Sequence, residues 1–182
     1  MRSGWLQLGE EMMPALEIDC ATAADSMTIG NLMQLYIHDF TELWAGTDRA
    51  ELQSDGRYGD YPDLDLYWRD PDRIPLLIRS HGRLIGFALL NRRSHSGALL
   101  DWNVGEFLIV RKYRRGRYGS AALAAILAQW PGRWEVAVVR NNLAALAFWR
   151  RALADNPDVA AIEENDLATD EWDGPVLGFV AG

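Results

Sequence analysis

The pattern of apolar and polar positions divides the chain into short segments that predict alternating strands and helices. An apolar segment at 16–19 predicts a first strand. Residues 25–44 predict a helix, because apolar side chains recur there every three or four positions. These apolar positions extend over more than one side of the helix, so we expect the helix to be heavily buried.

The segment 45–75 has no regular apolar period. Its acidic residues alternate with tyrosine and tryptophan, and glycine and proline residues interrupt it repeatedly. We therefore predict a long loop, with a short helix around 64–68.

Further along the chain, two apolar runs separated by Gly82 predict a β-hairpin over 76–90. The glycine supplies the positive φ angle that the turn requires. A long strand is predicted at about 99–110. A buried helix follows at 121–128 and ends before Pro131.

The last part of the chain completes the pattern. A strand at 134–139 precedes a helix at 142–151, whose first residue, Asn142, is a favourable N-terminal cap. Two further strands are predicted near 159–163 and 176–180. This order of elements predicts a mixed α/β layer fold.

Length and composition indicate a single domain. The chain has 182 residues, of which 49% are hydrophobic, and this is enough for a substantial core. We expect residues 1–12 to form an appendage and residues 13–182 to form the domain, with Met13 as the natural start.

The composition also narrows the classes of function. A net charge of −8 argues against general nucleic-acid binding. The chain has no apolar run of about 18 residues and no apolar stretch near its start, which predicts neither a membrane span nor a signal peptide. The single cysteine, Cys20, excludes an internal disulfide, fits a cytoplasmic protein and is interpreted as a small core residue.

A basic loop carries the strongest chemical signal. Five of the seven residues from Arg111 to Arg117 are lysine or arginine, and Gly116 and Gly119 lie within or just after this run. The loop joins the long strand to the buried helix, so the first amides of that helix face it without internal partners. This arrangement predicts a phosphate-binding loop, with a solvated basic turn or a nucleic-acid patch as the alternatives.

Two short motifs follow one another in this half of the chain. Arg114 and Gly119 hold the first and last places of the pattern Arg/Gln-x-x-Gly-x-Gly/Ala. The pattern Asn-x-x-Ala-x-x-aromatic-Tyr is followed, with tryptophan in its final place, by Asn142, Ala145, Phe148 and Trp149. In this order, over about residues 76–154, the motifs resemble those of the GNAT superfamily of N-acetyltransferases.

The resemblance implies a GNAT fold, in which a central mixed, mostly antiparallel sheet splays between its fourth and fifth strands. It implies an acyltransferase that moves an acetyl group from acetyl-CoA, its co-substrate, to a primary amine by direct attack in a ternary complex. The acceptor is an unknown amine-bearing small molecule or peptide, and a homodimer is compatible with the family. No nucleic acid, membrane or metal is expected.

The same resemblance implies where acetyl-CoA binds. Its pyrophosphate would lie on the basic loop and the first turn of the helix, and its pantetheine arm would pair with the backbone of Leu108 and Val110. The implied cofactor-binding residues are Leu108, Ile109, Val110, Arg114, Arg115, Gly116, Arg117, Tyr118, Gly119, Ser120, Asn142 and Phe148.

Glu106 is the first candidate for the base that takes the proton of the amine. It lies four residues before Val110 on the same predicted strand, so both side chains face the same side. Glutamates at this place serve as the base in some family members; a structural carboxylate is the alternative. The tyrosine that protonates the departing thiolate in the family is Trp149 here, and an indole is no acid at neutral pH. Three alternatives follow: the indole N–H of Trp149 caps the thiolate with a hydrogen bond, Tyr118 takes over the role of the acid, or the thiolate leaves unassisted.

A second departure from the family lies in the loop itself. Arg117 occupies the place of the first loop glycine, and the glycine is displaced to Gly116. Together with Trp149, this residue favours an alternative function, a degenerate GNAT domain that binds CoA or a protein partner without efficient turnover.

The acidic and aromatic segment would border the acceptor pocket, because aromatic faces and carboxylates attract ammonium groups. The candidate substrate-binding residues are Asp39, Tyr61, Tyr67 and Trp68. The alternative is that these side chains anchor the loop to the core. No metal-ligand cluster is present, since His38 is interpreted as structural and His81 and His95 as surface residues.

Overall fold

The computed structural model describes residues 15–182. Its strands are β1 (Glu17–Cys20), β2 (Ile74–Ser80), β3 (Arg83–Asn91), β4 (Trp102–Ile109), β5 (Gly132–Ala137), β6 (Val159–Ala168) and β7 (Asp173–Ala181). Its α-helices are α1 (Ser26–Thr41), α2 (Tyr118–Gln129) and α3 (Leu143–Ala154), and its 3-10 helices are η1 (Ala23–Asp25), η2 (Leu64–Trp68) and η3 (Arg111–Tyr113). The expectations for residues 1–12 and for Met13 as the start lie outside the described residues.

The predicted order of elements is confirmed, with changes at some ends. Gly82 has a φ angle of 70°, and the side chain of Asn142 accepts a hydrogen bond from the amide of Ala145 at 3.1 Å, as a helix cap does. β4 begins at Trp102, later than expected, and both C-terminal strands are longer than expected. Cys20 is exposed on the edge strand β1, so its interpretation as a core residue is wrong.

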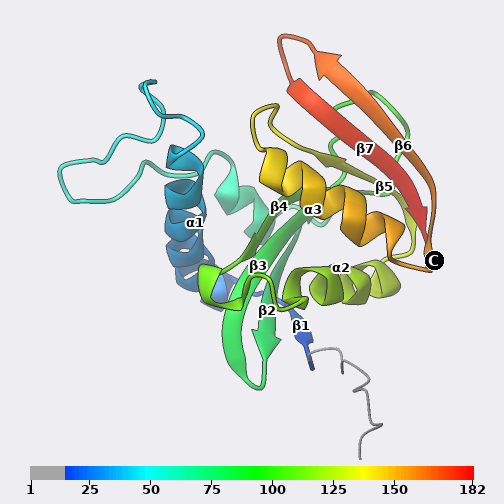
Figure 1. Ribbon diagram of the computed structural model, residues 1–182. Coiled ribbons are helices and arrows are strands. Elements are labelled where there is room, and N and C mark those ends of the chain that lie inside the picture. Colours follow the sequence, from blue (N-terminus) through cyan, green and yellow to red (C-terminus); the bar gives the residue numbers. More distant parts are fainter. Residues whose placement is uncertain (1–14) are drawn as a thin grey trace, which may run out of the picture.

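The strands of residues 15–182 form a seven-stranded sheet in the order β1-β2-β3-β4-β5-β7-β6. Neighbouring strands are antiparallel except β4 and β5, which run parallel. These two pair from Trp102 to Val104 on β4 and from Trp134 to Val136 on β5. Beyond Val104, β4 continues to Ile109 paired with β3, and Figure 1 shows the two halves of the sheet diverging. The predicted splay between the fourth and fifth strands is therefore confirmed.

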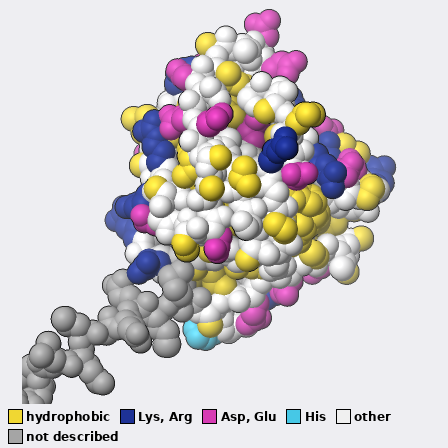
Figure 2. All heavy atoms as spheres, turned by 90° about the vertical axis from the view of Figure 1, so that its right-hand side faces the viewer, with side chains coloured by type: hydrophobic (Ala, Val, Ile, Leu, Met, Phe, Trp, Pro, Cys, Tyr) yellow, Lys and Arg dark blue, Asp and Glu magenta, His cyan; other side chains and the backbone are white. Residues whose placement is uncertain are grey.

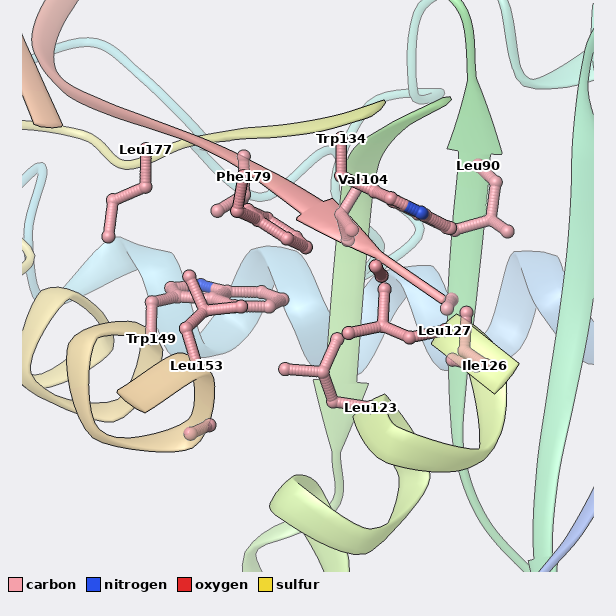
Figure 3. Packing of buried hydrophobic residues seen from close by; sticks show 14 of the residues in the cluster. Leu90, Val104, Leu123, Ile126, Leu127, Trp134, Trp149, Leu153, Leu177 and Phe179 are labelled. Carbon is pink, nitrogen blue, oxygen red and sulfur yellow. The ribbon is translucent and has the colours of Figure 1, made fainter. Parts of the chain in front are cut away.

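Helices cover both faces of the sheet, with α1 against one face and α2 and α3 against the other (Figure 1). The larger core lies under α2 and α3 and includes Leu123, Trp134, Trp149 and Phe179 (Figure 3). α2 carries no charged residue and is built mainly of alanine, leucine and isoleucine, which explains its deep burial. The rings of Trp134 and Phe179 stack, with centroids 6.2 Å apart and an interplanar angle of 9°.

The smaller core lies under α1. Its buried members are Ile29, Leu32, Met33, Tyr67, Leu77, Phe87, Leu89 and Leu108. Val110 packs against this cluster, whereas Phe107 and Ile109 pack with residues of the α2 side. The alternation along β4 thus directs successive side chains to α1 and to α2 in turn.

The C-terminal hairpin of β6 and β7 forms one margin of the sheet. Figure 2 looks onto this side of the molecule, where acidic and basic side chains are interspersed with apolar ones. Most of β6 is exposed, in keeping with its acidic residues Glu163, Glu164 and Asp166. Among the helices of residues 15–182, none is long and apolar enough to cross a membrane.

The close pairing of β3 with β4 generates a stability prediction at Gly86. A β-carbon at this position would lie 1.9 Å from the carbonyl oxygen of Leu108, so alanine must push two buried strands apart. We expect Gly86→Ala to lower the free energy of unfolding by about 2 kcal/mol or more, as overpacking does in other cores. Urea unfolding followed by tryptophan fluorescence measures the loss.

Gly178→Ala on β7 is the matched control, because no atom lies within 4 Å of the added carbon there. Equal unfolding free energies for the two variants would contradict the close contact at Gly86.

Candidate functional site

The loop predicted to bind phosphate joins β4 to α2. The chain leaves β4 through η3 and enters α2 at Tyr118. The amide of Ala121 donates to the carbonyl of Arg117 at 3.0 Å, which is the first hydrogen bond of the helix. The amides of Tyr118, Gly119 and Ser120 therefore have no acceptor within the helix, and such amides favour an anionic ligand.

Two arginines of this loop adopt a backbone conformation that favours glycine. Arg115 has a φ angle of 65°, and Arg117, the N-cap of α2, has a φ angle of 61°. A non-glycine residue in this left-handed region costs roughly 1 kcal/mol or more. The backbone at Arg117 thus has the shape that the family's glycine would readily adopt, although the residue differs.

A close contact fixes the start of α2 against α3. A β-carbon at Gly119 would lie 3.0 Å from Cε2 of Phe148. The ring of Phe148 stacks on that of Phe107, with centroids 5.9 Å apart, and the ring of Trp149 lies 5.5 Å from that of Phe107. Trp149 is only 6% exposed. The N-terminus of α2, the helix α3 and β4 therefore meet around Phe107, beyond the point where β4 and β5 separate.

The backbone of β4 corrects one expectation. The amide of Val110 donates to the carbonyl of Ile85 on β3 at 2.9 Å, so it points away from the splay. Successive peptide groups point to alternate sides of a strand, and the carbonyl of Leu108 accordingly approaches β3 as well. An extended ligand paired with Leu108 and Val110 does not fit this geometry. Phe107 and Ile109 are the residues whose backbone faces the splay.

Asp39 ties the basic loop to α1. Arg111 donates from Nε to Asp39 Oδ1 at 2.8 Å, and Arg114 donates from Nη2 to Asp39 Oδ2. Arg114 also donates from Nε to the carbonyl of Ile109 at 2.7 Å. Burial would raise the pKa of Asp39, but the hydrogen bonds from Arg114 and Arg111 outweigh it and hold the pKa below its ordinary value. Asp39, expected beside the acceptor, and Arg114, expected beside the pyrophosphate, bind each other in the structure.

Glu106, the candidate base, lies on the face of β4 that α1 covers. Tyr61 donates a hydrogen bond to Glu106 Oε1, and Tyr36 of α1 also donates to this carboxylate. Both tyrosines belong to the side-chain cluster that contacts Val110, so Glu106 and Val110 share a face as predicted. The acidic and aromatic segment thus reaches the candidate base through Tyr61.

The pKa of Glu106 suits proton transfer. Burial raises this pKa to about 7, against the hydrogen bonds from Tyr36 and Tyr61, which lower it. Burial and the neighbouring carboxylate together raise the pKa of both phenols well above the ordinary value, so the tyrosines remain donors. A carboxyl group that titrates near neutral pH can serve as a general base.

A polar network extends from this site along the same side of the sheet. Asn91 donates to the hydroxyl of Tyr67 at 3.1 Å, and Asn103 donates to Asn91 Oδ1 at 3.1 Å. The Oδ1 atom of Asn103 is buried and has no partner among residues 15–182. Tyr67 is 7% exposed and Trp68 packs against the α1 core, so both match the alternative in which they anchor the loop.

A second carboxylate, Glu135 on β5, holds the segment between β3 and β4. It accepts hydrogen bonds from the amide of His95 at 2.6 Å and from the hydroxyls of Ser94 and Ser96. Burial would raise the pKa of Glu135, but the hydrogen bonds from His95 and Ser96 lower it to about 2. The side chain of His95 is 15% exposed and its ring lies 4.7 Å from that of Trp172, so its interpretation as a surface residue is wrong.

The remaining site candidates have mainly structural contacts. The ring of Tyr118 lies edge-on to that of Tyr113, with centroids 5.4 Å apart. The side-chain oxygen of Asn142 caps α3. In the part of the chain that the structure describes, no group of three or more His, Cys, Asp or Glu side chains could hold a metal ion.

Sequence reasoning missed three residues that contact the candidate site residues: Tyr36, Asn91 and Arg111. For Tyr36 a signal existed, because it lies three residues before Asp39 and therefore on the same side of α1. For Asn91 and Arg111 no local pattern singles out the contact that each one makes.

The chain matches one protein family over most of its length. Residues 31–154 match the model of the acetyltransferase (GNAT) family. No curated protein sequence matches the chain.

Solved structures share the fold. An acetyltransferase from Thermus thermophilus has 17% identity and a TM-score of 0.64, over 93% of this chain and 99% of that chain. The GNAT domain of S. lividans PAT has 15% identity and a TM-score of 0.57, over 92% and 90%. The ribosomal-protein-S18-alanine N-acetyltransferase from Escherichia coli has 14% identity and a TM-score of 0.53, over 92% and 93%. At these identities the likeness shows the fold alone.

The pKa of Glu106 generates a prediction about stability against pH. This pKa is about 7 in the folded chain and about 4.5 in the unfolded chain, so the folded state binds the proton more tightly. The contribution of Glu106 to stability is therefore fully present below pH 4.5 and is lost as the pH rises through 7. Relative to Glu106→Gln, the wild-type protein should lose about 3 kcal/mol of unfolding free energy over this range.

Chemical denaturation at a series of pH values measures both proteins. The difference between the unfolding free energies of the two proteins isolates the effect of Glu106, because the other titrating groups contribute equally to both. A difference that stays constant from pH 4.5 upward would show that Glu106 has an ordinary pKa.

Proposed function

Because the chain belongs to the acetyltransferase (GNAT) family, we propose that it transfers the acetyl group of acetyl-CoA to a primary amine, which attacks directly within a ternary complex. The observation that carries this proposal is the meeting of three parts at the splay of the sheet. These parts are the N-terminus of α2, the open edge of β4 and the carboxylate of Glu106. They suit the phosphates, the pantetheine arm and the amine, respectively.

The residues at the splay fit acetyl-CoA. The first amides of α2 suit its pyrophosphate, and the helix dipole adds a favourable positive potential. Arg115 adds a positive charge beside this turn. The backbone of Phe107 and Ile109 suits the extended pantetheine arm, which would add to β4 as a strand.

Acetyl-CoA supplies the activated acyl group, and the residues of this chain manage the proton. The amine nitrogen bonds to the acyl carbon, the carbon–sulfur bond breaks and CoA leaves as a thiolate. The proton that the nitrogen loses passes to Glu106, whose pKa of about 7 suits this transfer. Holding the amine between Glu106 and the thioester contributes further through proximity and orientation.

Trp149 stands where the family places a tyrosine. Its indole N–H donates a hydrogen bond but no proton, so it would stabilise the thiolate rather than protonate it. A thiol has a pKa near 8.5, which makes its thiolate a tolerable leaving group at neutral pH. The same residue favours the alternative function, a domain that binds CoA without efficient turnover.

We place the acceptor on the α1 side of the sheet, where Glu106 points. Tyr36 and Tyr61 donate to this carboxylate and present their rings beside it. Aromatic faces next to a carboxylate attract an ammonium group, which releases one proton to solvent before it attacks as the neutral amine. The acceptor class is therefore an amine-bearing small molecule or peptide.

The cofactor site predicts how the chain binds acetyl-CoA. We expect calorimetric titration to give a dissociation constant on the order of micromolar, within the usual range for enzymes and their substrates. Arg115→Glu should weaken binding about tenfold or more, and the loss should shrink in high salt because exposed charges are screened. Arg151→Glu, an exposed position on α3, is the control and should bind as the wild type does. Equal affinity for both variants would remove Arg115 from the site.

The proposed base predicts an activity profile. Release of the CoA thiol is measured with a panel of primary amines and short peptides. Glu106→Gln should lower kcat/KM about 100-fold with its acetyl-CoA affinity unchanged. Wild-type activity should rise with pH through about 7 as Glu106 loses its proton, and the variant should lack this rise.

A wild-type protein that binds acetyl-CoA but releases no thiol with any acceptor of the panel would favour the non-catalytic alternative. In that case Trp149→Tyr tests whether a missing acid is the cause, since it restores the phenol of the family motif.

A further inference from the structure

We propose that Asp39 is a positioning residue for the cofactor loop. By holding Arg111 and Arg114 against α1, it fixes the turn from which the phosphate-binding amides project. The inference rests on the proposed function, because it takes the loop to be the site of the acetyl-CoA phosphates.

Asp39 uses both of its carboxylate oxygens for this contact. Oδ1 accepts from Arg111 Nε at 2.8 Å and Oδ2 accepts from Arg114 Nη2. The side chain of Asp39 is 18% exposed, so solvent screens these ion pairs less than it screens fully exposed pairs. We call this set of interactions the Asp39 contact.

The Asp39 contact brackets one turn of the chain. Arg111 is the first residue of η3 and Arg114 is its C-cap, so both ends of this turn are held by the same carboxylate. Arg114 also donates from Nε to the carbonyl of Ile109 at 2.7 Å, which fixes the turn against the end of β4. The contacts with Asp39 and with the carbonyl of Ile109 therefore fix the direction in which the chain leaves β4.

The loop beyond this turn needs such support. Arg115 and Arg117 both have positive φ angles, 65° and 61°, that non-glycine residues rarely adopt. A strained backbone conformation persists only where several surrounding contacts hold it in place. The Asp39 contact lies directly before these two residues and is suited to hold the loop in the shape that opens the α2 amides.

The same contact separates the roles of the basic residues. Both guanidinium groups of the Asp39 contact are held by one carboxylate, which fixes their positions and offsets one of their two positive charges. Arg115, which follows directly, is then the residue whose charge serves the phosphates. The loop's arginines thus include a structural pair, Arg111 and Arg114, and a proposed ligand-binding residue, Arg115.

α1 joins the loop to the candidate base. Tyr36 lies three residues before Asp39 on this helix, and residues at that spacing share one side. Tyr36 donates to Glu106, while Asp39 holds Arg111 and Arg114. One helix therefore positions both the residue that takes the proton and the loop that takes the phosphates.

The test compares Asp39→Asn with wild type in acetyl-CoA affinity and in the steady-state constants. The substitution keeps the shape and removes the charge. We expect the KM for acetyl-CoA to rise about tenfold with kcat unchanged, because loop ordering becomes part of binding. Asp39→Glu should recover part of the affinity. Glu164→Gln is the matched control, because Glu164 also binds one arginine through both oxygens, and it should leave KM unchanged.

A double-mutant cycle separates positioning from general destabilisation. If the Asp39 contact acts as a unit, Asp39→Asn combined with Arg114→Gln should weaken acetyl-CoA binding no more than either single change does. Additive losses, unchanged affinity or tighter binding in Asp39→Asn would each overturn the proposal. Should Asp39→Asn fail to fold, Arg111→Gln and Arg114→Gln, which change more exposed side chains, form the corresponding pair.

Amide hydrogen exchange of the unliganded protein keeps this inference apart from the proposed function. Asp39→Asn should speed exchange in peptides that cover residues 110–120, and Glu164→Gln should not. A wild-type protein that binds no acetyl-CoA would overturn the proposed function alone, whereas unchanged exchange in Asp39→Asn would overturn the positioning role.

Discussion

The short parallel pairing of β4 with β5 is the constraint on which the candidate site depends. The two strands pair at Trp102–Val104 and Trp134–Val136, and β4 then runs on to Ile109. Backbone amides and carbonyls that lose a neighbouring strand need other partners. The carbonyl of Ile109 receives Arg114 Nε, and the backbone groups before it form an edge that suits an added strand. The N-terminus of α2 lies at the same divergence, where we propose that the pantetheine arm and the phosphates of acetyl-CoA bind.

The divergence alone would leave a loosely defined site, and α1 supplies the missing rigidity. This helix packs on the face of the sheet opposite α2, with Ile29, Leu32 and Met33 buried. Tyr36 of this helix contacts the carboxylate of Glu106, and Asp39 of the same helix binds the turn that follows β4. The two functional parts of the site therefore move with one packed element.

Sequence patterns predict those structural features that depend on residues close together in the chain. The cap of α3 at Asn142 and the turn at Gly82 depend on neighbours a few residues away, so their residue types were sufficient. The shared face of Glu106 and Val110 follows from the alternation of one strand. The pairing of β3 with β4, in which the amide of Val110 donates to Ile85, decides which backbone groups of β4 face the splay. A shift of this pairing by one residue would turn the opposite set of backbone groups toward the splay.

Contacts between distant segments had no such signal. Asp39 and Arg114 are far apart in the sequence and meet only because α1 and the loop lie against the same strand end. Their opposite charges suggested a substrate and a phosphate as partners, yet packing made them partners of each other. The expectation that His95 lies at the surface fails for a related reason. Loop residues are usually exposed, but this segment is bound to the buried Glu135 on β5, which lies far away in the sequence.

The two carboxylates Glu106 and Glu135 show how environment, and not residue type, assigns a role. Glu135 accepts hydrogen bonds from the amides and hydroxyls of one short segment, and these hold its pKa at about 2 despite burial. Glu106 has two phenol donors, which do not offset burial, and its pKa rises to about 7. The first is therefore charged at any physiological pH and acts as an anchor. The second exchanges its proton near neutrality, which is the property that a base for an amine requires.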